Sequence, residues 1–325
     1  MKRLGSSRKL LDNSLIANLN PTRTCCNQNS QGRSEAKKIL QLKPDSTPLV
    51  AVGGLGGSGT RVVAQILHAM GFYLGPVMNP QLDNLLFTLL FKRRDWIECF
   101  PSDPDIDRML DIFVCAMRDG VEEGFKSLGP GEVEYQFEQA RGMGIDRPTL
   151  NAILASPRPA PNLQSQVAWK EPNTHVFLPQ LARRFSNMKY IHVMRNGLDM
   201  ALSGNRQQLR NWGSHFNIRQ GDDESPEQVQ LRYWLATNRR AIELGESLLP
   251  KRFFLLNYDA LCLCFHAEIY RLQNFLERQL SGEEISMIAG SIAPESIGRY
   301  RESAADTFTS EERKAVQKLG KRPAS

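Results

Sequence analysis

From residue 48 onward, short continuous apolar runs alternate with longer stretches in which apolar positions recur with the period of a helix. Continuous apolar runs of this length are typical of strands that are buried on both faces of a sheet. The runs lie at 48–52, 166–170, 189–195 and 252–258, and the helical patterns lie at 61–71, near 174–185, near 198–209 and up to residue 275. Strands that alternate with helices predict an α/β fold with a mostly parallel sheet flanked by helices.

The stretch 75–165 does not follow this alternation. It has no strand-like pattern and contains three clusters rich in Gly and Pro, so we expect a helical insertion or lid there. Residues 1–46 carry no periodic apolar pattern. The predicted organisation is therefore a tail over 1–46 and one domain over 47–325 that contains the insertion.

The composition of the 325 residues changes this picture little, since 41% are hydrophobic. No apolar stretch approaches the roughly 20 residues of a membrane span, and the first thirty residues lack the apolar core of a signal peptide. We expect a cytoplasmic protein without a transmembrane span. The spacing of the six cysteines suits neither zinc nor a disulfide framework, which favours a reducing compartment and structural thiols.

The net charge of +6 is confined to the N-terminal tail. Residues 1–40 hold eight basic and two acidic side chains, and the remaining 33 basic and 33 acidic side chains cancel. The domain is therefore not expected to bind nucleic acid. A tail of this composition predicts disorder, and a solvated tail and an organelle transit peptide both stay open.

A glycine-rich turn, "GGLGGSGTR" at 53–61, joins the first predicted strand to its helix. Gly54, Gly56 and Gly59 fit the G-x-G-x-x-G fingerprint of dinucleotide-binding proteins. That fingerprint needs a ribose-binding carboxylate about 20 residues further on, and 67–82 contains no Asp or Glu. A P-loop that binds magnesium-ATP fits no better, because Thr60 stands in place of its lysine and Arg61 in place of its metal-binding hydroxyl.

The turn instead predicts an anion cradle that needs no metal. Backbone N–H groups at the start of a helix bind anions through aligned donors and the helix dipole. The cradle residues are Gly54, Gly56, Gly57, Ser58, Gly59, Thr60 and Arg61. A turn that binds nothing is the alternative, but so many glycines are conformationally costly for that purpose.

A second anion site is predicted at "RNGLDMALS", residues 195–203. Arg195 ends a predicted strand, and Asp199 and Ser203 are four residues apart, on one face of the predicted helix. The carboxyl ends of parallel strands share one edge of a sheet, so Arg195 and the glycine-rich cradle predict a ligand with two separated phosphate groups.

These motifs resemble those of sulfotransferases that use 3′-phosphoadenosine 5′-phosphosulfate (PAPS). "GSGTR" at 57–61 is similar to the family's 5′-phosphosulfate cradle, and "RNGLDMALS" is similar to its 3′-phosphate motif, with the spacing from Arg195 to Ser203 intact. "WKEP" at 169–172, "NYDAL" at 257–261 and "GRYR" at 298–301 resemble further family elements. Gly57 departs from the family's usual basic residue, and Gly197 departs from its proline.

The resemblance implies a P-loop-like sulfotransferase fold and in-line transfer of a sulfonate from PAPS to an acceptor hydroxyl or amine, without a metal. Lys170 is then the expected cation at the bridging oxygen, and the candidate general bases are Asp83, His175 and Glu171. Tyr258 is expected near the adenine, and Arg299 or Arg301 near the 3′-phosphate.

The acceptor itself is not specified by these motifs. We expect its pocket between 75–165 and the loop around Trp212, His215 and Arg219, with a carbohydrate favoured over a lipid or a phenol. The alternatives are a non-catalytic protein that binds adenosine 3′,5′-bisphosphate (PAP) and an atypical P-loop kinase.

Overall fold

A four-stranded sheet forms the centre of the molecule, in a computed structural model that describes residues 49–164, 166–292, 294, 297–303 and 307–320. The strands are β1 (Val50–Gly54), β2 (Ala168–Lys170), β3 (Lys189–Met194) and β4 (Phe253–Asn257). They pair in parallel, in the order β2-β1-β3-β4. The four predicted strands and the α/β fold with a parallel sheet are confirmed. The tail predicted for 1–46 lies outside the described residues.

The register of the strands brings distant parts of the sequence to one edge of the sheet. Val52 of β1 pairs with Lys170 of β2 on one side and with Ile191 of β3 on the other, and Met194 pairs with Asn257 of β4. Because all strands point the same way, their carboxyl ends share the edge at which α/β proteins usually bind ligands. The glycine-rich turn, Lys170, Arg195 and Tyr258 all follow or end these strands.

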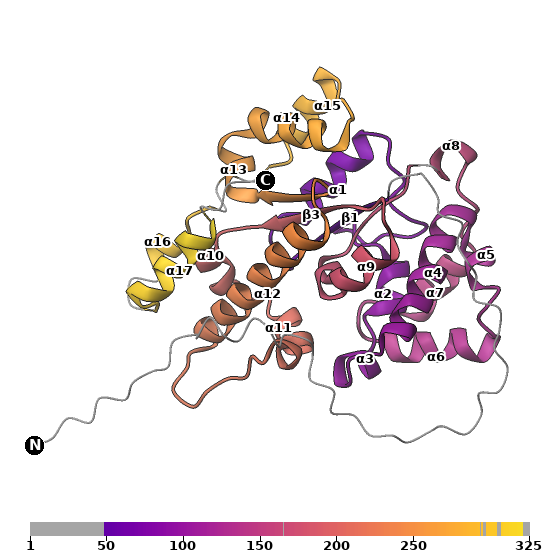
Figure 1. Cartoon of the computed structure of the whole chain (residues 1–325), viewed down its shortest axis with the longest axis horizontal. Helices are drawn as coiled ribbons and strands as arrows, with labels where there is room; N and C mark the ends of the chain where they lie inside the picture. Colours follow the sequence, from indigo (N-terminus) through magenta and orange to yellow (C-terminus); the bar gives the residue numbers. More distant parts are fainter. Residues whose placement is uncertain (1–48, 165, 293, 295–296, 304–306, 321–325) are drawn as a thin grey trace, which may run out of the picture.

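Side chains of the sheet alternate between two apolar cores. Val50 and Val52 pack in a cluster with side chains of α1 (Thr60–Ala69) and α14 (Phe265–Leu276), whereas Ala51 packs in a cluster with side chains of α4 (Asp103–Asp119) and α12 (Pro226–Leu248). Figure 1 shows α1, α14 and α15 (Gly282–Ala289) on one side of the strands and α9 (Leu178–Arg184), α10 (Gly197–Ala201) and α12 on the other. Helices therefore cover both faces, as the apolar strands require.

The stretch between α1 and β2 is helical, and its helices lie together on the right of Figure 1, next to α9. Besides α4 it contains α2 (Leu85–Phe91), α3 (Arg94–Glu98), α5 (Val121–Phe125), α6 (Pro130–Ala140), α7 (Arg147–Leu154) and α8 (Pro161–Gln164). Every residue of α2 is buried, so this stretch shares the larger of the two apolar cores. Its role as a lid stays a prediction.

The remaining elements follow β2, β3 and β4. They are the 3₁₀ helices η2 (Pro172–Phe177) and η3 (Gly213–Phe216), and the helices α11 (Gln207–Trp212), α13 (Tyr258–Leu263), α16 (Tyr300–Ser303) and α17 (Ser310–Gly320). α17 contacts α10 and α12, which places the C-terminal segment near the end of β3.

Two helix predictions need correction. The helix expected at 174–185 begins as 3₁₀ helix η2 and continues as α9, because Pro179 has no N–H to donate to the carbonyl of His175. That carbonyl accepts a hydrogen bond from Arg240 instead, at 3.2 Å. The helix expected at 198–209 is divided into α10 and α11 at Ser203-Gly204-Asn205, a sequence that favours a turn.

The described cysteines match the expected thiols only in part. Cys115, Cys262 and Cys264 are free, whereas Cys99 is disulfide-bonded, so the expectation of thiols alone is wrong for Cys99. Among the described residues, no helix combines the length and the apolar character that a bilayer span requires.

Candidate functional site

The turn between β1 and α1 has the backbone of a narrow cradle. Gly54, Gly57 and Gly59 have φ angles of 151°, 95° and 97°, which residues with a side chain rarely adopt. A Cβ atom at Gly54 would lie 2.4 Å from the carbonyl oxygen of Val193, and one at Gly59 would lie 2.0 Å from the ring of Tyr258. The two ends of the turn therefore need glycine both for conformation and for space.

Donors of this turn are available to an anion. Ser58 is 1% exposed, and its hydroxyl has no hydrogen-bond partner among the described residues. Thr60 and Arg61 are the first residues of α1, where backbone N–H groups have no acceptor within the helix. Thr60 is buried, and Arg61 is exposed. A buried polar hydroxyl without a partner beside free helix N–H groups fits a phosphate or sulfonate oxygen.

Arg195 lies beside this cradle, as the sequence predicts. It follows β3, and its Nη1 donates to the carbonyl oxygen of Gly57 at 3.4 Å. The guanidinium carbon is 5.6 Å from the ring centre of Tyr258, whose ring also packs against Gly59. Trp234 donates to the carbonyl oxygen of Arg195 at 3.1 Å, which fixes the chain where β3 ends. Arg195, Tyr258 and the cradle therefore form one continuous group.

Asp199 joins the C-terminal segment to the same region. Its carboxylate accepts hydrogen bonds from the backbone N–H groups of Gly298, at 2.8 Å, and Tyr300, at 3.0 Å. Arg299 lies between these two anchored residues and is exposed. Ser203 follows the end of α10, and its hydroxyl accepts a hydrogen bond from the N–H of Asn205 at 3.3 Å. The sequence placed Asp199 beside Ser203 but did not assign this anchoring contact to it.

Two of the predicted catalytic residues form an ion pair with each other. The ammonium group of Lys170, which ends β2, pairs with the carboxylate of Asp83 and donates to the carbonyl oxygen of Gln81 at 3.0 Å. The side chains are 3% and 19% exposed, respectively. The amide group of Asn79 donates to Asp83 at 2.9 Å and fixes the carboxylate. The spacing of 87 residues between Lys170 and Asp83 gave no sign of this contact.

Glu171, the next residue, is a buried carboxyl group. Burial raises its pKa to about 7, the ammonium group of Lys92 opposes this shift, and the Asp83 carboxylate adds to it. Both carboxyl oxygens accept from Asn173, one from the backbone N–H at 2.6 Å and one from the side-chain amide at 2.8 Å. An acid with a pKa near neutrality can exchange a proton at physiological pH.

His175, the third predicted catalytic residue, does not join Lys170 and Asp83. It has no exposed surface, and neither ring nitrogen has a hydrogen-bond partner in the described part of the chain. Burial, together with His192 and Arg240, holds its pKa well below the ordinary value. The ring packs against Phe216 and His192, with ring centres 6.0 Å and 6.3 Å away, so its environment is that of a core residue.

The loop expected to contact the acceptor is partly buried. Trp212 has no exposed surface and donates to the side-chain oxygen of Asn173 at 3.0 Å, so the expectation that it faces an acceptor is wrong. His215 contacts the carbonyl oxygen of Ile97 at 2.6 Å, and Arg219 is exposed. Two polar residues of this region that sequence reasoning missed, Asn173 and Gln208, contact the cradle or its neighbours.

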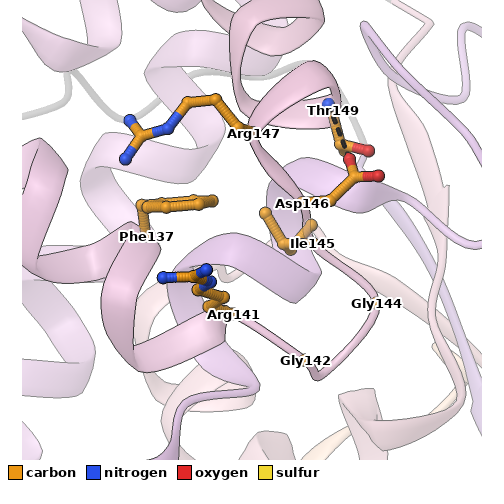
Figure 2. Close-up of a pocket in the computed structure, with 8 residues that line it drawn as sticks. All are labelled: Phe137, Arg141, Gly142, Gly144, Ile145, Asp146, Arg147 and Thr149. Carbon is orange, nitrogen blue, oxygen red and sulfur yellow. Dashed lines mark hydrogen bonds between the residues drawn. The ribbon is translucent and has the colours of Figure 1, made fainter.

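A cavity of about 710 Å³ lies apart from these residues, between α6 and α7. Figure 2 shows Arg141 and Arg147 on opposite sides of the Phe137 ring. Gly142 and Gly144 also line the cavity. The Arg147 guanidinium is 3.9 Å from the ring centre and is paired with Glu134, and Arg141 is paired with Glu138. No predicted site residue lines this cavity. Among the described residues, no group of three or more His, Cys, Asp or Glu side chains could hold a metal ion.

Comparison with known proteins gives one decisive finding. The model of the sulfotransferase family matches residues 48–282, which include the cradle, Lys170, Arg195 and Tyr258. Comparison with curated protein sequences finds no match.

Solved structures give more distant likenesses. The sulfotransferase domain of the curacin biosynthetic pathway is 14% identical, with a TM-score of 0.46, and the match covers 83% of this chain and 96% of that one. The sulfotransferase domain of the olefin synthase from Synechococcus PCC 7002 is 16% identical, with a TM-score of 0.43 and coverage of 84% and 93%. Retinol dehydratase, solved with androsterone and the inactive cofactor PAP, is 14% identical, with a TM-score of 0.36 and coverage of 86% and 80%. These similarities are too low to support a conclusion about the activity of this chain.

Proposed function

Because this chain belongs to the sulfotransferase family, we propose that it transfers a sulfonate group from PAPS to an acceptor hydroxyl or amine. One observation carries the proposal: Arg195 and the ring of Tyr258 lie directly against the glycine cradle. A cradle alone suits many phosphates. A cradle with an arginine and an aromatic ring beside it suits a nucleotide that carries phosphate at two separate positions.

The residues divide between the two ends of such a nucleotide. Ser58, Thr60 and Arg61 would hold the 5′-phosphosulfate through the buried hydroxyl, the helix N–H groups and one cation. Arg195 and Ser203 would hold the 3′-phosphate, and Tyr258 would pack against the base. Arg299 is held in the same region by the contacts of Asp199 and would add a cation from the C-terminal segment.

In the transfer, the acceptor oxygen or nitrogen forms a bond to sulfur while the bond between sulfur and the bridging 5′ oxygen breaks. The bonding electrons of that bond stay with PAP, and the acceptor proton must go to a base. Lys170 is the residue proposed to stabilise the charge that grows on the bridging oxygen. Lys170 ends β2 at the carboxyl edge of the sheet, where it pairs with Val52 of β1, and Asp83 holds its ammonium group.

Asp83 is the base that the geometry favours. It is partly exposed, it contacts Lys170, and its carboxylate is oriented by Asn79. A shift of Lys170 toward the bridging oxygen would weaken its ion pair with Asp83 and leave the carboxylate able to accept a proton. Glu171 has a pKa suited to a base, but it is 2% exposed and accepts two hydrogen bonds from Asn173. His175 has no exposed surface through which an acceptor could reach it.

For the acceptor we propose a carbohydrate. The loop from Arg219 to Asp223 is exposed and polar, and polar side chains suit hydroxyl-rich acceptors better than lipids or phenols. A non-catalytic PAP-binding protein and an atypical kinase remain the alternatives to the enzyme.

Calorimetric titration of the purified protein with PAP in EDTA tests the nucleotide site. Parallel titrations use magnesium-ATP and NAD. We expect PAP to bind without metal, and Arg195→Ala to weaken binding by more than about tenfold, since a charge-assisted pair to phosphate is lost. Arg210→Ala, which removes an exposed arginine of α11, is the matched control. Unchanged PAP affinity in Arg195→Ala contradicts the two-phosphate site.

Transfer itself is tested separately, with ³⁵S-labelled PAPS and a panel of oligosaccharide, phenol and amine acceptors. Labelled product from the oligosaccharides supports the proposed enzyme and its acceptor class. PAP binding without any labelled product favours the non-catalytic protein, and binding of magnesium-ATP alone favours the kinase.

A further inference from the structure

A chain of side-chain hydrogen bonds runs from the interior to the anion cradle. Glu171 accepts from the amide group of Asn173 at 2.8 Å, and the side-chain oxygen of Asn173 accepts from Gln208 Nε2 at 3.0 Å. Gln208 Oε1 in turn accepts from the backbone N–H of Gly56 at 2.7 Å. Trp212 also donates to the oxygen of Asn173, at 3.0 Å. Residues 152 positions apart in the chain are thereby joined.

The direction of each hydrogen bond in this chain is fixed from both ends. The indole of Trp212 can only donate, so Asn173 must turn its oxygen toward it and its NH₂ group toward Glu171. The backbone N–H of Gly56 can only donate, so Gln208 must turn its oxygen toward the cradle. The NH₂ group of Gln208 then meets the oxygen of Asn173, which completes a consistent set of donors and acceptors.

Gln208 also spans the turn itself. Besides accepting from Gly56, it donates through Nε2 to the carbonyl oxygen of Gly54 at 3.3 Å. One side-chain amide therefore holds a backbone acceptor and a backbone donor on either side of Leu55. Glycine-rich backbone has many accessible conformations, and each must be excluded before the turn can present its donors.

We propose that Gln208 is a positioning residue, which clamps the turn in its anion-binding conformation and keeps its place when the ligand binds. The clamp uses the N–H of Gly56 and leaves the N–H groups at the start of α1 for the ligand. Ordering the turn in advance lowers the entropy that binding must remove, which raises the affinity for the ligand. If the ligand instead had to displace Gln208 from the turn, the side chain would lower the affinity for the ligand.

The first test measures affinity and rests on the proposed nucleotide site. Gln208→Ala, Gln208→Glu and the control Gln207→Ala, an exposed neighbour on α11, are titrated with PAP and with adenosine 5′-monophosphate. We expect Gln208→Ala to weaken both ligands by about tenfold with their affinity ratio unchanged, because the cradle serves the 5′ side that both share. Gln208→Glu should weaken both further, since it adds negative charge and loses both donated bonds. Unchanged or tighter binding in Gln208→Ala overturns the clamp.

The second test uses the free protein and does not depend on the ligand. Hydrogen exchange of the segment 53–60 should be faster in Gln208→Ala by about tenfold, while exchange in the sheet stays as in the wild type and in Gln207→Ala. Unchanged exchange in this segment overturns the positioning role. If the wild-type protein binds neither nucleotide, the proposed function fails, and the exchange result still decides whether Gln208 orders the turn.

Discussion

The carboxylate of Asp83 is paired with the buried ammonium group of Lys170 at the edge of the sheet. If Asp83 is the base, Asp83→Asn should lower kcat by roughly 10²- to 10⁴-fold and leave PAP affinity nearly unchanged. The variant also leaves Lys170 without its partner, which costs stability, so rates are compared at a temperature at which both proteins are folded. Steady-state transfer from labelled PAPS to the best acceptor of the panel gives kcat. Asp222→Asn, at an exposed loop position, is the control, and a kcat close to the wild-type value in Asp83→Asn would exclude it as the base.

Glu171 makes a prediction about pH, because its pKa is raised to about 7 in the folded protein by burial. In the unfolded chain an ordinary glutamate has a pKa near 4.3, so the folded state binds the proton more tightly. Between these two values the folded protein holds more protons, and stability falls as the pH rises, by on the order of 3 kcal/mol in total. Urea unfolding from pH 5 to pH 8 measures this slope. In Glu171→Gln the slope should be flatter, and an equal slope in both proteins contradicts a raised pKa.

At the scale of an element, the turn between β1 and α1 allows the conformational cost of adding a side chain to be distinguished from the steric cost. Gly57 and Gly59 have nearly the same φ, 95° and 97°, but a Cβ at Gly57 would have no atom closer than 3.7 Å, whereas one at Gly59 would meet Tyr258 at 2.0 Å. Gly57→Ala should cost about 1–2 kcal/mol, from conformation alone. Gly59→Ala should cost more and should weaken PAP binding, because the Tyr258 ring must move. Denaturant unfolding and calorimetry of the two variants give both quantities, and equal effects would show that the ring yields without cost.

The sequence predicts these elements well where the pattern is local. The apolar run at 48–52 identifies the buried strand β1, and the glycines that follow it identify the turn. The break after α10 was also present in the sequence, in Ser203-Gly204-Asn205, but helical periodicity across it concealed the turn. The pair of Lys170 with Asp83, and the clamp of Gln208 on Gly56, depend on contacts between residues far apart in the chain. No local pattern specifies such contacts, because they arise only when the elements pack.

On the scale of the whole molecule, the parallel sheet brings candidate site residues from distant parts of the chain to one edge. Lys170, Arg195 and Tyr258 belong to three strand ends, and the C-terminal segment reaches them through Asp199. α17 packs against α10 and α12, so this segment is held at two places. Residues 297–303 are therefore anchored beside the candidate site, although the family match ends at residue 282.

Asp199→Ala tests this arrangement. The substitution removes the acceptor of the Gly298 and Tyr300 N–H groups, and loss of two hydrogen bonds to a charged group should cost roughly 3 kcal/mol locally. Because only the C-terminal segment depends on them, hydrogen exchange should rise in 297–303 and 307–320 and not in the strands.

The same substitution should lower PAP affinity severalfold if Arg299 supplies a cation to the 3′-phosphate. The double variant Asp199→Ala, Arg299→Ala should then bind PAP no more weakly than Asp199→Ala alone. Asp222→Ala is the control. Additive losses in the double variant would mean that Asp199 and Arg299 act independently, and that the anchored segment does not serve to present Arg299.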